Sequence, residues 1–263
     1  MKTLYYNYPV KHLNVCDNWN ELTQSQFIRI AKLLHSGIAD TDILLDKALQ
    51  ILCDKSLYKF LLTPFEVRLD AYEHVKWIFE EQQGITKQYI TQYDGLHGPE
   101  SEFNNLKLAE FHHAEMAFYI FHKEETIDAL DEFVSVLYRE PKKNYDRDRN
   151  PDGDSRVPFN YQDIQWNKRK IKKWPLEVKQ AIAMWYAGCK ELLRKIYPTV
   201  FTSSGTDDGY FEGMFSIIRN IAGDKYGSFN DVEQMFVHLA FKELCCLIEE
   251  QQELEKQLNT QRA

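Results

Sequence analysis

The chain has 263 residues, a formal net charge of −8 and 44% hydrophobic residues. This is the composition of a folded globular protein, and it excludes a disordered, collagen-like or disulfide-scaffold protein. Aromatic residues make up 14% of the chain, whereas glycine and proline number only 11 and 8. Many large rings and few chain-breaking residues favour long helices around a substantial core over a loop-rich β fold.

Signals for export and membrane insertion are not found in the sequence. No apolar segment of a secretory signal follows Met1, and the longest strongly apolar stretch without charge, Ala181–Cys189, is too short to cross a bilayer. An odd number of cysteines without a Cys-x-x-Cys pair favours reduced thiols, so we expect a cytoplasmic protein. The five are Cys16, Cys53, Cys189, Cys245 and Cys246.

The first predicted helix has a well-defined start. Thr23 and Gln26 have the spacing of a capping box. Leu22 and Phe27 have the spacing of the accompanying hydrophobic staple. Apolar residues then recur at helical intervals, and we expect Gly37 to end the helix.

Two more helices are predicted in the first half of the chain. Asp40 or Thr41 caps the second, whose apolar residues continue to Leu52. Pro64 opens the third, which is expected to run to a stop at Gly84.

Two short segments, Leu4–Val10 and Lys87–Tyr93, break the helical pattern. Both are rich in the residues that favour strands, namely tyrosine, isoleucine, threonine and valine. We expect them to form one small antiparallel ribbon beside the helices.

The second half of the chain returns to helical spacing. The last helix is predicted to be capped by Asn230 and Glu233, and its polar end, EEQQELEKQLNTQR, is expected to protrude. Its apolar stripe is Val232, Met235, Phe236, Leu239, Ala240, Leu247 and Leu254. The predicted helices are Leu106–His122, Thr126–Tyr138, Pro175–Tyr197, Gly209–Ala222 and Asn230 to about Gln257.

These elements predict a mainly α protein, with a multi-helix, bundle-like architecture and at most a small antiparallel β-ribbon. A loop with glycine and proline near residue 95 suggests two units, 1–95 with the ribbon and 96–263, although one continuous domain fits as well. The second unit contains a loop over 141–158 that we interpret as too polar to lie in the core.

One loop resembles the start of a calcium site. Residues 148–153 read D-x-N-x-D-G, the opening of an EF-hand loop. Its ninth position is Arg156 and its twelfth is Phe159 instead of a bidentate glutamate, so an ordinary turn is favoured. The candidate calcium ligands are Asp148, Asn150, Asp152 and Asp154.

No catalytic motif is found. Glu110 and His113 have the Glu-x-x-His spacing of di-iron bundles, but the chain has no second such pair, so a structural role is favoured. Nucleophile-elbow, P-loop and dinucleotide-binding patterns do not occur either. We therefore predict no catalytic residue, no bound metal and no cofactor.

A basic cluster is the strongest candidate for an interaction surface. The segment Arg139–Lys173 has a net charge of +5, so the remainder carries −13. Such a segment could contact phosphates, form a solvated helix face, or complement an acidic surface on a partner or a second copy. The candidate residues are Trp166, Lys168, Arg169, Lys170, Lys172, Lys173 and Trp174.

Several sequence segments, taken in order along nearly the whole chain, resemble a group of known proteins. They are WNELTQSQF, GLHGPESEFNNLKLAEF, LYREP, DGDSRVPFN, YAGCKELLRKIYPTVF and GDKYGSFNDVEQ. In this order the chain resembles helical proteins encoded in the tail-gene regions of bacteriophages and prophages of the Bacteroides group. The resemblance implies a role in virion morphogenesis, as a tail assembly chaperone or a minor virion component, and it brings no active site with it.

We therefore expect a non-enzymatic interaction factor that works in the host cytoplasm or in the virion. Its expected partners are other tail or virion proteins or a second copy of itself, and neither nucleic acid nor a membrane. The polar end of the last helix is a candidate for self-association or docking. Two alternatives remain open, a structural ring or connector protein and a metal-binding enzyme.

Overall fold

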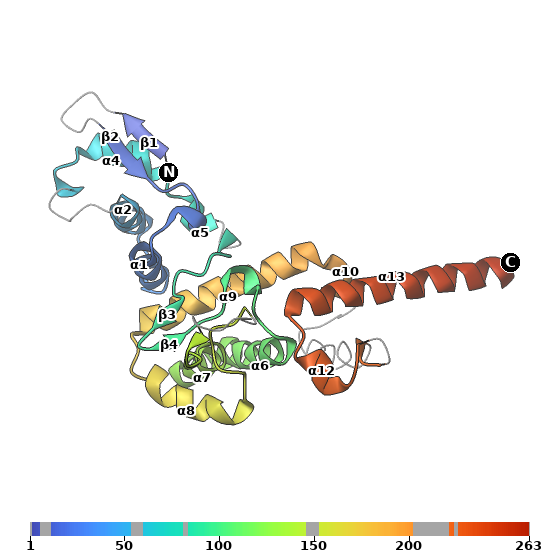
Figure 1. Cartoon of the computed structure of the whole chain (residues 1–263). Helices are drawn as coiled ribbons and strands as arrows, with labels where there is room; N and C mark the ends of the chain where they lie inside the picture. The colour runs from blue at the N-terminus through green and yellow to red at the C-terminus, as the bar shows by residue number, and fades with distance from the viewer. Residues whose placement is uncertain are drawn as a thin grey trace. The chain divides into compact units, whose positions relative to one another are not determined.

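The chain is mainly α-helical, and its strands form two small two-stranded antiparallel sheets in the part of the chain that the structure describes (Figure 1). This confirms the predicted fold class. The structure is a computed structural model that describes residues 2–5, 12–53, 60–80, 84–145, 153–201, 221–223 and 226–262.

The chain divides into two compact units. The first unit comprises Met1–Ile90 and Trp174–Gly188, and the second comprises Thr91–Lys173 and Cys189–Ala263. The division differs from the expected units 1–95 and 96–263 in one main respect, because a segment from the middle of the second half belongs to the first unit. The long helix α9 (Leu176–Ile196) therefore contributes residues to both units.

Where it is described, the first unit is built from short helices and a hairpin. Apart from its part of α9, it contains β1 (Lys2–Tyr5), β2 (His12–Val15), α1 (Gln24–Leu34), α2 (Thr41–Leu52), α4 (Phe65–Tyr72) and α5 (Trp77–Glu80).

Gln26 links the start of α1 to the end of α2. Its side-chain oxygen accepts a hydrogen bond from the backbone N–H of Thr23, which completes the predicted capping box. Its Nε2 group donates to the carbonyls of Ile51 and Leu52, at 3.1 Å each. Because the last carbonyls of a helix have no partner within the helix, Gln26 caps two helices at once.

The predicted third helix is interrupted. Instead of one helix from Pro64 to Gly84, α4 ends at Tyr72 and α5 begins at Trp77. Between them the backbone makes hydrogen bonds of the i to i+3 type. This tighter winding places Val75 and Ile78 in the core together, where both are fully buried.

The two predicted strand segments do not pair with each other. β1 pairs with β2, and β3 (Gln92–Tyr93) pairs with β4 (Leu96–His97), so each forms a hairpin with the strand that follows it. Asp94 and Gly95 have positive φ angles of 47° and 76°, the conformation of a type I′ hairpin turn. The Asp-Gly signal for this local pairing is present in the sequence, and residues 6–10 lie outside the described part.

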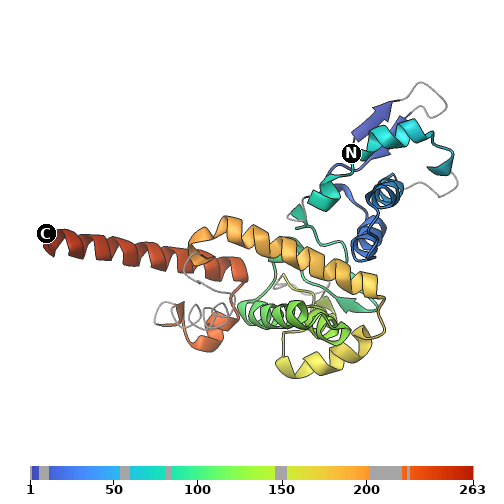
Figure 2. The same cartoon turned by 180° about the vertical axis from the view of Figure 1, so that it is seen from behind.

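The second unit is centred on a hairpin of two helices that lie side by side, α6 (Leu108–Glu124) and α7 (Ile127–Leu137) (Figure 2). Glu125, with φ of 53°, ends α6, and the Thr126 hydroxyl accepts from the N–H of Ala129 to cap α7. Apart from its part of α9, the described residues of this unit also form α8 (Ile164–Ile171), α10 (Pro198–Phe201), α12 (Phe229–Glu233) and α13 (Val237–Arg262).

The last helix is also shorter than predicted at its start. Met235 and Val237 exchange backbone hydrogen bonds with the segment before α6, which requires a non-helical backbone between α12 and α13. Ser228 and Asp231 form the capping box of α12, in place of the expected Asn230 and Glu233. Most of the helix predicted over 209–222 lies outside the described residues.

The double role of Gln26 can be tested with Gln26→Glu. Glutamate preserves the capping-box acceptor but removes the donor to the carbonyls of Ile51 and Leu52, so we expect the free energy of unfolding to fall by about 1–3 kcal/mol. Urea denaturation measures this. Gln24→Glu is the control, because it adds the same charge to an exposed position of the same helical turn. Equal effects of the two substitutions would contradict the proposed link.

Candidate functional site

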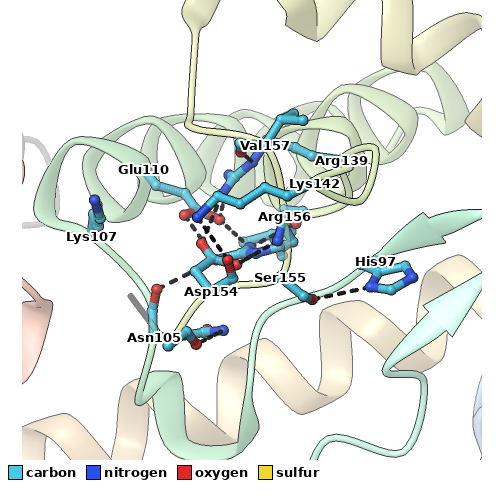
Figure 3. Close-up of polar contacts among 12 residues, drawn as sticks. His97, Asn105, Lys107, Glu110, Arg139, Lys142, Asp154, Ser155, Arg156 and Val157 are labelled. Carbon is cyan, nitrogen blue, oxygen red and sulfur yellow. Dashed lines mark hydrogen bonds and ion pairs between the residues drawn. The ribbon is translucent and has the colours of Figure 1, made fainter. Parts of the chain in front are cut away.

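Four charged side chains form a buried network in the second unit. They are Glu110 from the first turn of α6, Arg139 just after α7, and Asp154 and Arg156 from the following loop (Figure 3). Each is at most 4% exposed. The loop was expected to be too polar to lie in the core, and that prediction is wrong for this part of it, because paired charges can be buried together.

Arg156 lies between the two carboxylates. Its guanidinium contacts both oxygens of Glu110, at 2.5 and 3.1 Å, and both oxygens of Asp154, at 2.8 and 3.0 Å. Both contacts are bidentate, the geometry in which arginine binds a carboxylate most strongly.

Arg139 adds the second positive charge. Its NH1 group lies 2.8 Å from Glu110, and its NH2 group lies 3.3 Å from Asp154. The network therefore contains two positive and two negative charges, which satisfies the condition for burying charge.

The network also stabilises the ends of the two central helices. Arg156 donates to the carbonyl of Leu137, and Arg139 donates to that of Val136, both at the C-terminus of α7. Glu110 lies in the first turn of α6, where a negative charge is favourable. Carboxylate and guanidinium groups thus lie at the helix ends whose dipoles favour their charges.

Further contacts hold the loop in place. The Lys142 ammonium donates to the carbonyl of Asp154 at 2.8 Å, and the Ser155 hydroxyl lies 3.0 Å from Nδ1 of His97. Asn105 donates to the carbonyl of Gly153 at 3.4 Å. His97 and Asn105 thus hold the loop to two other segments of its unit, and Lys142 joins the two ends of the loop.

The two arginines differ in their electrostatics. Burial lowers the pKa of Arg156, but the charge of Glu110 and the hydrogen bonds of Asp154 outweigh this effect, so its pKa lies above the usual value. Burial dominates at Arg139, whose pKa is lowered because it makes fewer contacts with the carboxylates and lies close to Arg156. Arg156 is thus the better-compensated charge.

The chemistry of the network favours a structural role over catalysis. Both oxygens of Glu110 and both oxygens of Asp154 already contact guanidinium groups. A general base or a metal ligand needs an accessible lone pair, and these carboxylates direct theirs to arginine. The network fixes the loop against α6 and the end of α7.

The residues of the calcium candidate do not fit the ion where they are described. Asp154 is engaged by two arginines, and Arg156 brings a positive charge to a position where calcium needs oxygen. Asp148, Asn150 and Asp152 lie outside the described residues. Within the described ranges, no group of three or more histidine, cysteine, aspartate or glutamate side chains is arranged to hold a metal ion.

Glu110 and His113, the second metal candidate, serve separate purposes. Glu110 belongs to the arginine network, whereas the His113 ring lies against the rings of Phe159 and Tyr161, with centroids 5.2 Å from each. The adjacent His112 is buried, and burial, together with the charge of His113, lowers its pKa from 6.5 to about 4.

Part of the predicted basic cluster serves as an internal brace. Lys168 is 6% exposed, and its ammonium group lies 2.8 Å from Asp128 and 2.9 Å from Glu132 of α7. Lys172 also pairs with Asp128, and Lys170 pairs with Glu140. These acidic partners neutralise much of the positive charge that was predicted to form a contact surface. The ion pairs instead join α8 and Lys172 to α7 and to Glu140, which follows α7.

The remaining residues of the cluster are divided between the surface and the core. Trp166 is 57% exposed, with the guanidinium of Arg169 5.7 Å from its ring centroid, and Lys173 is exposed as well. Trp174 is buried and belongs to the first unit. The structure therefore exposes four of the seven residues, Trp166, Arg169, Lys172 and Lys173, leaves Lys170 half-buried, and buries Lys168 and Trp174.

Comparisons with protein-family models, curated proteins and solved structures found no match. Within the described residues, no helix is both long enough and apolar enough to cross a membrane.

Arg156→Met tests the importance of the network. The substitution leaves Glu110 and Asp154 buried with only one arginine, so we expect a loss of about 3–5 kcal/mol in the free energy of unfolding. Urea denaturation measures it, with Arg169→Met at an exposed arginine as the control, expected within about 0.5 kcal/mol of the parent. A loss below about 1 kcal/mol for Arg156→Met would show that the network is dispensable.

His112 predicts a pH dependence of stability. Its lowered pKa means that the unfolded chain binds a proton below pH 6.5, whereas the folded chain resists protonation until about pH 4. The stability that comes from keeping His112 neutral is therefore complete above pH 6.5 and falls as the pH drops toward 4. At pH 5 the loss relative to pH 7 is roughly 2 kcal/mol.

We therefore expect His112→Gln to reduce the difference in the free energy of unfolding between pH 7 and pH 5. His35→Gln, at an exposed histidine, is the control. An unchanged pH difference in His112→Gln would exclude His112 as its source.

Proposed function

We propose that this chain is a non-enzymatic protein-interaction factor in phage tail or virion morphogenesis, with a role like that of a tail assembly chaperone. The phage assignment is supported by the sequence resemblance. The interaction role is supported by one observation, an exposed apolar surface on the first unit. This surface, the α4 patch, consists of Leu61, Leu62, Phe65 and Leu69, which are 54–61% exposed.

The α4 patch brings large exposed apolar side chains close together in the sequence. Its four large side chains lie within nine consecutive residues, and Phe65 and Leu69 lie one helical turn apart on the same face of α4. Single exposed apolar residues are common, but clustered ones are typical of sites that bind another protein.

The patch is held by a polar support. The Arg68 guanidinium lies over the rings of Phe60 and Phe65, 5.3 and 5.7 Å from their centroids, and pairs with Asp46 of α2 at 2.7 Å. The Tyr72 hydroxyl donates to the same carboxylate at 2.8 Å. Burial and this hydrogen bond raise the pKa of Tyr72 to about 12, so the hydroxyl remains a donor at neutral pH.

An apolar surface that is held in place by polar contacts could bind the client proteins of an assembly chaperone. Its clients in a tail would be helical proteins with apolar stripes that are exposed before assembly, and an amphipathic helix binds by placing such a stripe on an apolar surface. Preorganisation by Arg68 and Asp46 lowers the entropic cost of binding.

Genetic complementation tests the proposal. In a phage that carries this gene, deletion is expected to prevent normal tail formation, and the parent gene is expected to restore it. The double variant Leu62→Ser/Phe65→Ser is expected to fail, because it makes the α4 patch polar. Electron microscopy of the lysate measures this, and circular dichroism checks that the variant is folded.

Ile127→Ser is the control, because Ile127 is a similarly exposed apolar residue of the second unit. Normal tails after deletion would contradict the assembly role, and full rescue by the double variant would contradict the role of the patch. Mass spectrometry of purified particles separates the two assembly roles, since a chaperone is absent from them and a structural component is present.

A further inference from the structure

The last helix, α13, is only partly packed against its unit. Val237, Ala240 and Leu244, in its first turns, are buried. From Glu249 to Gln257 every residue is exposed, and the C-terminal half of α13 extends away from the other helices of its unit (Figure 1, red). A helical segment of this length without tertiary contacts is marginal in water, because isolated helices shorter than about 12–15 residues are barely stable.

The buried face of α13 continues along the exposed half of the helix. Starting at Val237, the positions 240, 244, 247, 251 and 254 follow at alternating intervals of three and four residues, which is the a/d spacing of a coiled coil. Leu247 is half-buried, and Leu254 is 60% exposed. The seam that anchors the helix to its unit therefore continues into solvent.

The charges beside this seam favour a basic partner. Glu250 and Glu255 occupy the flanking g and e positions, and both are exposed. In a parallel pair of identical helices, Glu250 of one copy would face Glu255 of the other. In an antiparallel pair g positions face g positions, so the register that sets Glu250 against the Glu250 of a second copy also brings like charges together.

We propose that the exposed half of α13 is a docking site for a basic amphipathic helix of another protein, with which it forms a two-stranded coiled coil. The partner has aliphatic residues at its seam and lysine or arginine at its flanking positions. Gln251, a polar residue within the seam, favours one register of this pairing. The site is separate from the α4 patch and does not rest on the proposed assembly role.

Two synthetic peptides of roughly three heptads test the proposal. Both carry leucine at the a and d positions, one with lysine and the other with glutamate at e and g. Fluorescence anisotropy with the full chain is expected to show that the lysine peptide binds at least about tenfold more tightly, and that added salt weakens its binding.

Charge reversal on two faces of the helix provides the matched comparison. Glu250→Lys/Glu255→Lys is expected to reverse the preference to the glutamate peptide. Glu249→Lys/Glu253→Lys makes the same change in net charge on the outward face and is expected to leave the preference unchanged. Leu254→Ser is expected to weaken binding of the lysine peptide by about tenfold or more.

Three results would overturn the proposal. The first is equal binding of the two peptides, and the second is an equal effect of the two double reversals, which would indicate non-specific attraction to an acidic protein. The third is a dimer of the full chain in sedimentation equilibrium that Leu254→Ser dissociates, because the seam would then bind a second copy. None of these results affects the complementation test of the α4 patch.

Discussion

The burial of Arg156 is the constraint on which the second unit depends. Removing a guanidinium from water costs several kcal/mol, and the cost is offset only when its donors all find acceptors in good geometry. Here the acceptors are two carboxylates and the carbonyls of Leu137 and Asn105. Because these groups come from the segment before α6, from α6, from the end of α7 and from the loop itself, one side chain fixes the positions of all four.

The helices could be predicted from the sequence because their signals are local. The capping box at Thr23, the cap at Thr126 and the apolar spacing of α9 each involve residues within a few turns of one another. The interruptions were not predictable in the same way. The break before Val237 arises from backbone hydrogen bonds to Leu106 and Leu108, more than a hundred positions away.

The charged network shows a second limit of reasoning from sequence. Glu110 and Arg156 are 46 positions apart, and the loop around Arg156 has a composition typical of surface turns. The one available signal was Glu110 itself, a carboxylate next to Leu108 and Phe111 on the buried face of a predicted helix. The same limit applies to Lys168. Its acidic partners, Asp128 and Glu132, lie outside Arg139–Lys173, the segment whose net charge of +5 predicted a contact surface.

The separation between Glu110 and Arg156 also has a consequence for how the second unit folds. Contacts between neighbours in the sequence form faster than contacts that close long loops. The α6–α7 hairpin needs only the turn at Glu125 and Thr126, so we expect it to form early, and the arginine loop to close onto it late. Until it closes, the loop exposes solvated charges and little apolar surface. We therefore expect the chain to resist aggregation during this late step.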